Sequence, residues 1–182
     1  MQWVVLWGVK ARAQTMKRSL EAYLDIETTG LSYFFDAITV IGIYRCDGIV
    51  GEVIQLVDEE VTRDNLLKTL EGVNTIYTYN GSRFDFPFIY AALGTDLEIR
   101  FQHHDLMYDC WDNNLYGGLK GVEQQLGIPR QLQGIHGVDA IEMWWRYKID
   151  HDQNALALLL EYNKEDVVNL KALRERLFLK SR

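Results

Sequence analysis

The sequence predicts an α/β fold in which helices cover a mixed β-sheet. Three features of the chain lead to this prediction. Apolar, β-branched runs separated by turn signals fill the first third, strands and helices alternate in the middle, and helical spacing dominates the last third. With 182 residues, the chain is long enough for one domain with a substantial core.

The first three predicted strands form an antiparallel meander. Residues 22–26 are apolar except for Asp25 and lead into a Thr-Thr-Gly turn, and residues 37–45 and 49–57 are rich in β-branched side chains. A Cys-Asp-Gly turn signal at residues 46–48 joins the last two strands. Tight turns between consecutive strands favour antiparallel pairing.

Helices and strands alternate next along the chain. We expect a helix over residues 62–70, a strand over 75–79, a helix over 87–93 and a strand over 99–107. Pro87 suits the first turn of the second helix, because the first turn does not use its backbone N–H.

The last third of the chain is predicted to be helical. A short helix over residues 119–126 is stopped by Gly127 and Pro129, and further helices are expected over 138–148 and 153–179. The sequence has no internal repeat, no low-complexity tract and no Gly/Ser/Pro-rich linker. Residues 21–182 are therefore expected to form one domain.

Residues 1–20 do not fit this pattern. Residues 3–9 are apolar, and a basic patch with Lys10, Arg12, Lys17 and Arg18 follows. The segment is predicted to be an N-terminal extension of unclear role, with an extra strand, an arm and an upstream segment as open alternatives.

Composition places the chain among globular proteins. Its content is 48% hydrophobic and 25% charged, and residues 3–9 and 155–160, the longest apolar stretches, are too short to cross a bilayer. No basic segment precedes an apolar run with a cleavage site, so we expect a cytoplasmic protein that makes no membrane contact. Cys46 and Cys110 are expected to be reduced, buried thiols.

Two acids lie two residues apart on the first predicted strand, within the segment YLDIETTG at residues 23–30. A strand repeats every two residues, so Asp25 and Glu27 share one face. Each carboxylate disfavours ionisation of the other, and a bound cation would offset that cost. The alternative is the exposed end of a strand with solvated acids.

A third acid, Asp85, lies in the segment YNGSRFDFP at residues 79–87, where it is a candidate ligand or an ordinary helix cap. The candidate substrate-binding residues are Thr28, Asn80 and Phe84. Asn80 is equally suited to fixing the loop, and Phe84 is better explained by core packing.

The fourth acid, Asp166, lies in YNKEDV at residues 162–167, four residues after Tyr162, so the two side chains share one helical face. A surface hydrogen-bonded pair is the alternative. Asp25, Glu27, Asp85 and Asp166 together offer the hard oxygen ligands that Mg²⁺ and Mn²⁺ prefer. Such a cage suits phosphodiester hydrolysis assisted by two divalent cations.

Several other polar residues carry weaker signals. The four histidines have no metal-ligand spacing, and Asp105 is expected to be structural. Arg83, Lys120 and Lys164 are equally well explained as phosphate contacts or as solvated charges. The net charge of −7 argues against a long basic groove and favours a short footprint near the end of a nucleic-acid strand.

The three acidic segments, taken together and in this order, resemble the motifs of DEDD-type, DnaQ-like 3′–5′ exonucleases of the ribonuclease H-like superfamily. The third segment resembles the tyrosine version, DEDDy, because Glu161 stands where the histidine version has His. The segment LKGVE at residues 119–123 and the Tyr162-Asn163 pair make the chain most similar to YprB-type predicted exonucleases. The resemblance covers about residues 21–178.

The resemblance implies a five-stranded mixed sheet flanked by helices and a 3′–5′ exonuclease. It implies that Asp25, Glu27, Asp85 and Asp166 hold two divalent ions and that Tyr162 orients the attacking water. The expected partner is a nucleic acid with a free 3′ end, single-stranded rather than duplex. A catalytically silent nucleic-acid-binding module and a hydrolase of short oligonucleotides are the alternatives.

Overall fold

The computed structural model describes residues 19–180, apart from the side chain of Lys180, and its strands form one five-stranded mixed sheet. The strand order is β3-β2-β1-β4-β5. The strands are β1 (Leu20–Thr28), β2 (Ile38–Cys46), β3 (Gly51–Val57), β4 (Val73–Thr78) and β5 (Gln102–Asp105). β1, β2 and β3 pair antiparallel, whereas β4 is parallel to both β1 and β5. The predicted meander and the predicted mixed α/β sheet are confirmed.

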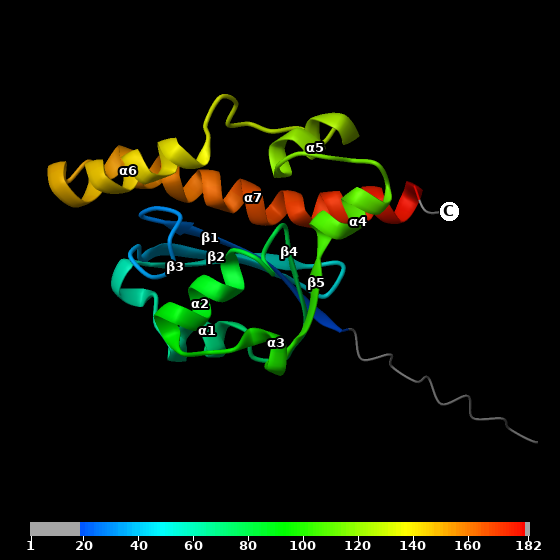
Figure 1. Ribbon diagram of the computed structural model, residues 1–182, viewed down its shortest axis with the longest axis horizontal. Helices are drawn as coiled ribbons and strands as arrows, with labels where there is room; N and C mark the ends of the chain where they lie inside the picture. Colours follow the sequence, from blue (N-terminus) through cyan, green and yellow to red (C-terminus); the bar gives the residue numbers. More distant parts are fainter. Residues whose placement is uncertain (1–18, 181–182) are drawn as a thin grey trace, which may run out of the picture.

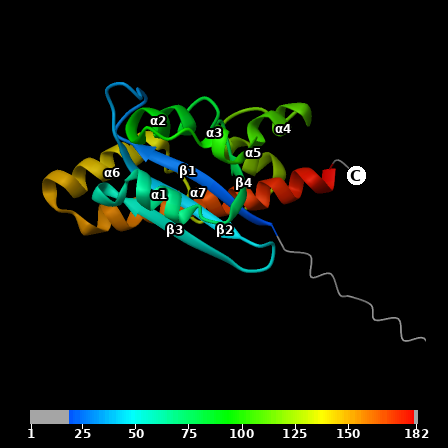
Figure 2. The same cartoon turned by 90° about the horizontal axis from the view of Figure 1, so that it is seen from below.

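Helices cover both faces of the sheet (Figure 1). One layer holds α1 (Arg63–Thr69), α2 (Asp85–Leu93) and α3 (Leu97–Arg100). The other holds α4 (Leu106–Asp112), α5 (Leu119–Leu126), α6 (Gly137–Asp150) and α7 (Gln153–Lys180). A short 3-10 helix, Asp58–Glu60, follows β3. Figure 2 shows the long α7 running behind the strands, from the α6 end of the molecule to the C-terminal end of the described residues.

The alternation of side chains along β1 divides the core into two. Ala22, Leu24 and Ile26 pack with residues of α1, α2 and α3, whereas Tyr23 packs with residues of α4, α5 and α7. Because Asp25 and Glu27 share the parity of Tyr23, their side chains leave β1 on the α7 face. The sheet therefore presents the first acidic pair to the helix that carries the third motif.

The predicted strand over residues 99–107 is wrong in extent. Only Gln102–Asp105 is a strand, and the short helices α3 and α4 flank it. The side chain of Asp96 accepts hydrogen bonds from the backbone N–H groups of Glu98 and Ile99, and Asp105 accepts one from Met107. Each aspartate thus caps a helix start, and these local caps override the apolar pattern.

The remaining predicted elements match the structure to within about two residues, and α5 matches at both ends. Gly127 ends α5 in the left-handed conformation, with φ of 64°. Cys46 and Cys110 are buried and free. No helix between residues 19 and 180 is long and apolar enough to span a membrane. The predicted N-terminal extension, residues 1–20, lies almost entirely outside the described residues.

Candidate active site

Three of the predicted acids converge between β1 and α7. Carboxylate oxygens of Asp25, Glu27 and Asp166 lie within 4.8 Å of one another. Glu27 and Asp166 are buried and Asp25 is partly buried. One oxygen of Glu27, Oε1, is buried with no hydrogen-bond partner among the described residues. This cluster joins two segments that are more than a hundred residues apart in sequence.

Asp85 lies beside this cluster. It starts α2, and its Oδ1 accepts a hydrogen bond of 3.1 Å from the backbone N–H of Ile26, which lies between Asp25 and Glu27. Although its charge acts on both β1 acids, Asp85 is not part of the group of three with mutually close oxygens.

The carboxyl groups raise one another's pKa values on top of the effect of burial. Burial is the largest cause for Asp25 and Glu27, followed by the charge of Asp166, and the pKa of each is well above its usual value. Burial raises the pKa of Asp85 to about 7, against the backbone hydrogen bonds that its carboxylate accepts. The pKa of Asp166 is also raised to about 7 by burial, although Arg130 and Lys120 act in the opposite direction. The site therefore carries a deficit of positive charge.

Asn163 holds Asp25 in place. Its side-chain amide donates to Oδ2 and to the backbone carbonyl of Asp25, at 3.2 and 3.4 Å, and its own oxygen accepts from Gln55 at 3.0 Å. Gly42 on β2 makes room for this amide, since a Cβ there would lie 2.0 Å from the Asn163 oxygen. A glycine in the middle of β2 is thus explained by the close approach of a side chain.

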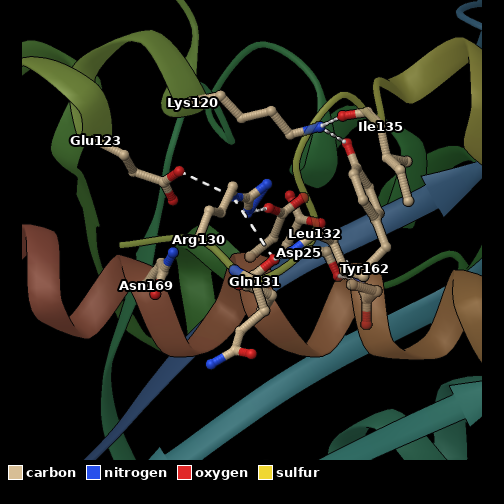
Figure 3. A network of polar contacts seen from close by, with 12 residues as sticks. Asp25, Lys120, Glu123, Arg130, Gln131, Leu132, Ile135, Tyr162 and Asn169 are labelled. Atoms are coloured by element: carbon tan, nitrogen blue, oxygen red, sulfur yellow. Dashed lines mark hydrogen bonds and ion pairs between the residues drawn. The ribbon is translucent and has the colours of Figure 1, made fainter. Parts of the chain in front are cut away.

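Lys120, from α5, reaches the hydroxyl of Tyr162 on α7 (Figure 3). Its ammonium donates to the Tyr162 oxygen at 2.6 Å and to the carbonyl of Ile135. Burial and the charges of Asp166 and Glu27 raise the pKa of Tyr162, so the phenol keeps its proton. Since the tyrosine oxygen accepts from Lys120, its own proton is free to be donated elsewhere.

Arg130 lies on the other side of Asp166, in the segment between α5 and α6. Its guanidinium forms an ion pair with Asp166 and another with Glu123, whose Oε2 lies 2.9 Å from Nε (Figure 3). Both the Arg130 and Glu123 side chains are almost fully buried.

A cavity of about 330 Å³ opens over the cluster. Asp25, Asp166, Tyr162, Lys120 and His136 are among the residues that line it. The cavity thus brings carboxylates, a protonated phenol and an ammonium to one space.

The donor set fits divalent cations. All the converging ligands are carboxylate oxygens, which suits Mg²⁺ or Mn²⁺ better than a metal that prefers sulfur or imidazole. The Glu27 oxygen has no hydrogen-bond partner among the described residues, and the pKa values of Asp25 and Glu27 are raised; a cation held between these carboxylates would offset both effects.

Comparison with protein families decides the family. The RNase_H_2 model, described as RNase_H superfamily, matches residues 22–178. The chain belongs to the RNase H superfamily. No curated protein matches the chain.

Solved structures share this RNase H fold. A family B DNA polymerase from the archaeon Pyrobaculum calidifontis is 20% identical with a TM-score of 0.67, over 88% of this chain and 24% of the polymerase. The chain therefore spans about a quarter of that polymerase. Brucella melitensis NrnC bound to pGG is 24% identical with a TM-score of 0.60, over 86% of this chain and 71% of NrnC. NrnC with bound Mg²⁺ is 24% identical with a TM-score of 0.56, over 89% and 75% of the two chains.

The three residues predicted to bind substrate occupy different settings in this RNase H domain. The Thr28 hydroxyl donates to the carbonyl of Gly30 at 2.5 Å. The backbone N–H of Asn80, with φ of 64°, donates to Asp105 at 2.8 Å, so Asn80 helps to fix its loop. Phe84 packs against the core, with its ring 4.9 Å from that of Phe88. A substrate contact by these residues stays a prediction.

Two groups were overlooked by the sequence reasoning. Asn163 follows Tyr162 and precedes Asp166 by three residues, so a polar side chain on the sheet-facing side of α7 was the available signal. Glu123 and Arg130 gave no such signal, because Arg130 pairs with Glu123 and Asp166 only when α5 and the following segment pack on α7. Asp105 has the expected structural role, because it accepts hydrogen bonds from the backbone N–H groups of Asn80 and Ser82.

Proposed function

We propose that this RNase H-superfamily chain is a metal-dependent 3′–5′ exonuclease that hydrolyses phosphodiester bonds of nucleic acid. The observation that carries the proposal is the convergence of Asp25, Glu27 and Asp166 within 4.8 Å, with Asp85 beside them. The proposal includes the DEDDy subtype, because Tyr162 lines the same cavity as Asp25 and Asp166. It also includes a likeness to YprB-type exonucleases, which is based on the LKGVE segment and the Tyr162-Asn163 pair.

Asp25, Glu27, Asp85 and Asp166 are the residues proposed to hold two divalent cations, Mg²⁺ or Mn²⁺. The chemistry that such cations supply is the activation of water and the stabilisation of the departing 3′ oxygen. The structure of NrnC with bound Mg²⁺ supports the choice of metal, although identity with NrnC is only 24%.

Tyr162 is proposed to orient the attacking water. Its oxygen accepts a hydrogen bond from Lys120 at 2.6 Å, and its raised pKa keeps the hydroxyl protonated, so the phenol can donate into the cavity. Lys120 also places a positive charge near the carboxylates, where a phosphate would otherwise be repelled. Asn163 holds the Asp25 carboxylate at a fixed angle through its amide.

The proposed substrate is a single strand with a free 3′ end. An opening of about 330 Å³ and a net charge of −7 favour contacts to a few terminal nucleotides over a long duplex footprint. The same observations favour a second candidate, a hydrolase of short oligonucleotides. NrnC has been solved with the oligonucleotide pGG, which supports this second candidate.

A length series of labelled strands tests both candidates. Single- and double-stranded DNA and RNA are incubated with Mn²⁺ or with chelator. Their lengths run from dinucleotides to strands longer than the roughly 4–16 nucleotides that a typical single-strand binding site spans. Shortening of 5′-labelled strands one nucleotide at a time supports the exonuclease. Turnover confined to the shortest substrates supports the second candidate, and binding without turnover in Mn²⁺ contradicts both.

A further inference from the structure

Arg130 is held in place by the segment that carries it. Glu165, the neighbour of Asp166 on α7, accepts hydrogen bonds from the backbone N–H groups of Gln131 and Leu132. Asn169, one helical turn further on, donates to the carbonyl of Pro129 at 3.4 Å. Arg130 therefore projects from a backbone that α7 fixes on both sides of it.

The guanidinium of Arg130 links two buried carboxylates. Nε lies 2.9 Å from Oε2 of Glu123 on α5 (Figure 3), and Nη2 contacts Oδ1 of Asp166 on α7. Glu123 is 1% exposed, and neither Nε nor Nη1 of Arg130 has a hydrogen-bond partner among the described residues, so the contact with Glu123 is an ion pair, whereas Nη2 donates to Asp166. The planar guanidinium of an arginine can contact two carboxylates at once in this way.

Arg130 approaches Asp166 from behind. Asp166 lines the 330 Å³ cavity with Asp25 and Tyr162, but Arg130 is not among its lining residues. Arg130 and Glu123 instead line a neighbouring cavity of about 560 Å³. A guanidinium in this position contacts the Asp166 carboxylate from the neighbouring cavity. It therefore leaves the side of the carboxylate that faces Asp25 and Tyr162 open.

Buried ion pairs add little net stability, since desolvation consumes most of the Coulomb attraction. What the Glu123–Arg130 pair does provide is a fixed orientation for the carboxylate that it contacts. Partners behind a metal ligand commonly set the ligand's orientation, and their removal weakens metal binding by about ten- to a hundredfold.

We propose that Glu123 and Arg130 are positioning residues that hold the Asp166 carboxylate in the orientation needed to bind a divalent cation. Glu123 fixes Arg130, and Arg130 fixes Asp166. The inference rests on the proposed function, because it concerns a ligand of the proposed metal site. It adds two residues from outside the three acidic motifs to that site.

The test is a manganese titration by calorimetry on the wild-type chain and on the double variant Glu123→Leu/Arg130→Met. Replacing both partners leaves neither of these two charges buried alone, and the charge of Lys120 still acts on Asp166, so the double variant is expected to fold. We expect it to bind Mn²⁺ about tenfold more weakly and to lose kcat while its KM for a labelled strand is unchanged. If the double variant unfolds, Glu123→Gln is used, with a smaller loss expected in the same direction.

The control is Arg146→Met, which makes the same substitution in an exposed ion pair with Asp152, 2.5 Å long. It should leave Mn²⁺ binding unchanged. A double variant with wild-type Mn²⁺ affinity would overturn the inference, and so would a raised KM with unchanged Mn²⁺ affinity, which would place Arg130 on the nucleic acid. If the wild-type chain itself binds no Mn²⁺, the proposed function fails and the positioning role fails with it.

Discussion

A single methyl group added to Gly42 on β2 should impair the site, because it would displace the Asn163 amide that holds Asp25. In Gly42→Ala, the new Cβ would lie 2.0 Å from Oδ1, 2.7 Å from Cγ and 2.9 Å from Nδ2 of Asn163. Ordinary contact begins at 3.4 Å, so the Asn163 amide must withdraw by roughly 1.4 Å. The amide cannot withdraw this far and keep its hydrogen bonds to Asp25 and from Gln55.

The size of the effect follows from these contacts. Overpacking of this kind costs about 1–3 kcal/mol of unfolding free energy. A shift of about 1 Å in a group that positions a reacting atom costs about a hundredfold in rate. We therefore expect Gly42→Ala to remain folded, to melt at a lower temperature and to turn over about a hundredfold more slowly.

Thermal melts and single-turnover rates on a labelled strand measure both effects, and the double variant Gly42→Ala/Asn163→Ala separates them. It removes the three atoms that the new Cβ meets, so it should recover much of the lost stability. Its rate should stay low, because no amide then holds Asp25. A Gly42→Ala chain as stable and as fast as the wild type would refute the reasoning. Full recovery of the rate in the double variant would remove Asn163 from the account of the site.

Four further outcomes are expected. Tyr162→Phe should keep Mn²⁺ affinity and slow turnover by roughly a hundredfold, as for one positioned polar group, whereas a wild-type rate would make Tyr162 a packing residue. Asp25→Asn and Asp85→Asn should keep the circular dichroism spectrum and lose most of the activity; unchanged turnover in either variant contradicts the metal site. In chelator, thermal stability should fall as the pH rises from about 4 to 7, because the folded-state pKa values of Asp85 and Asp166 are both raised to about 7, so the folded state holds more protons than the unfolded state across this range. Mn²⁺ should reverse this loss most strongly at the higher pH, and a melting temperature independent of pH in chelator would count against the site. A closed circular single strand should survive in Mn²⁺, and its cleavage would identify an endonuclease.

Much of the acidic cluster could be predicted from the sequence, because the spacing of its residues matches the repeat of the strand or helix that carries them. Asp25 and Glu27 lie on one face of β1 through the two-residue repeat of a strand. Tyr162 and Asp166 lie on one face of α7 through the four-residue spacing of a helix. The order of strands and helices could also be predicted, because most elements end at Gly, Pro or capping residues, whose effect is local.

The failures have two causes. The predicted strand over residues 99–107 followed the apolar pattern and missed the local caps by Asp96 and Asp105, each of which starts a short helix. The other failures depend on contacts between residues far apart in the sequence. Arg130 appeared as one charge in a loop, since only the packing of α5 on α7 brings Glu123 and Asp166 to its guanidinium. Gly42 was only one residue of an apolar run in the sequence. The need for a glycine there is explained by the Asn163 side chain, which approaches β2 from α7.

The central claim is that the carboxylate cluster shortens nucleic-acid strands from the 3′ end with the help of divalent cations. Its most direct test compares wild type and Asp25→Asn, purified in parallel, on a 5′-labelled single strand in Mn²⁺ under single-turnover conditions. The account predicts a ladder of products that shorten from the 3′ end with the wild type, and an intact strand with the variant or in chelator. An intact strand with the wild type, or an equal ladder with Asp25→Asn, would contradict it.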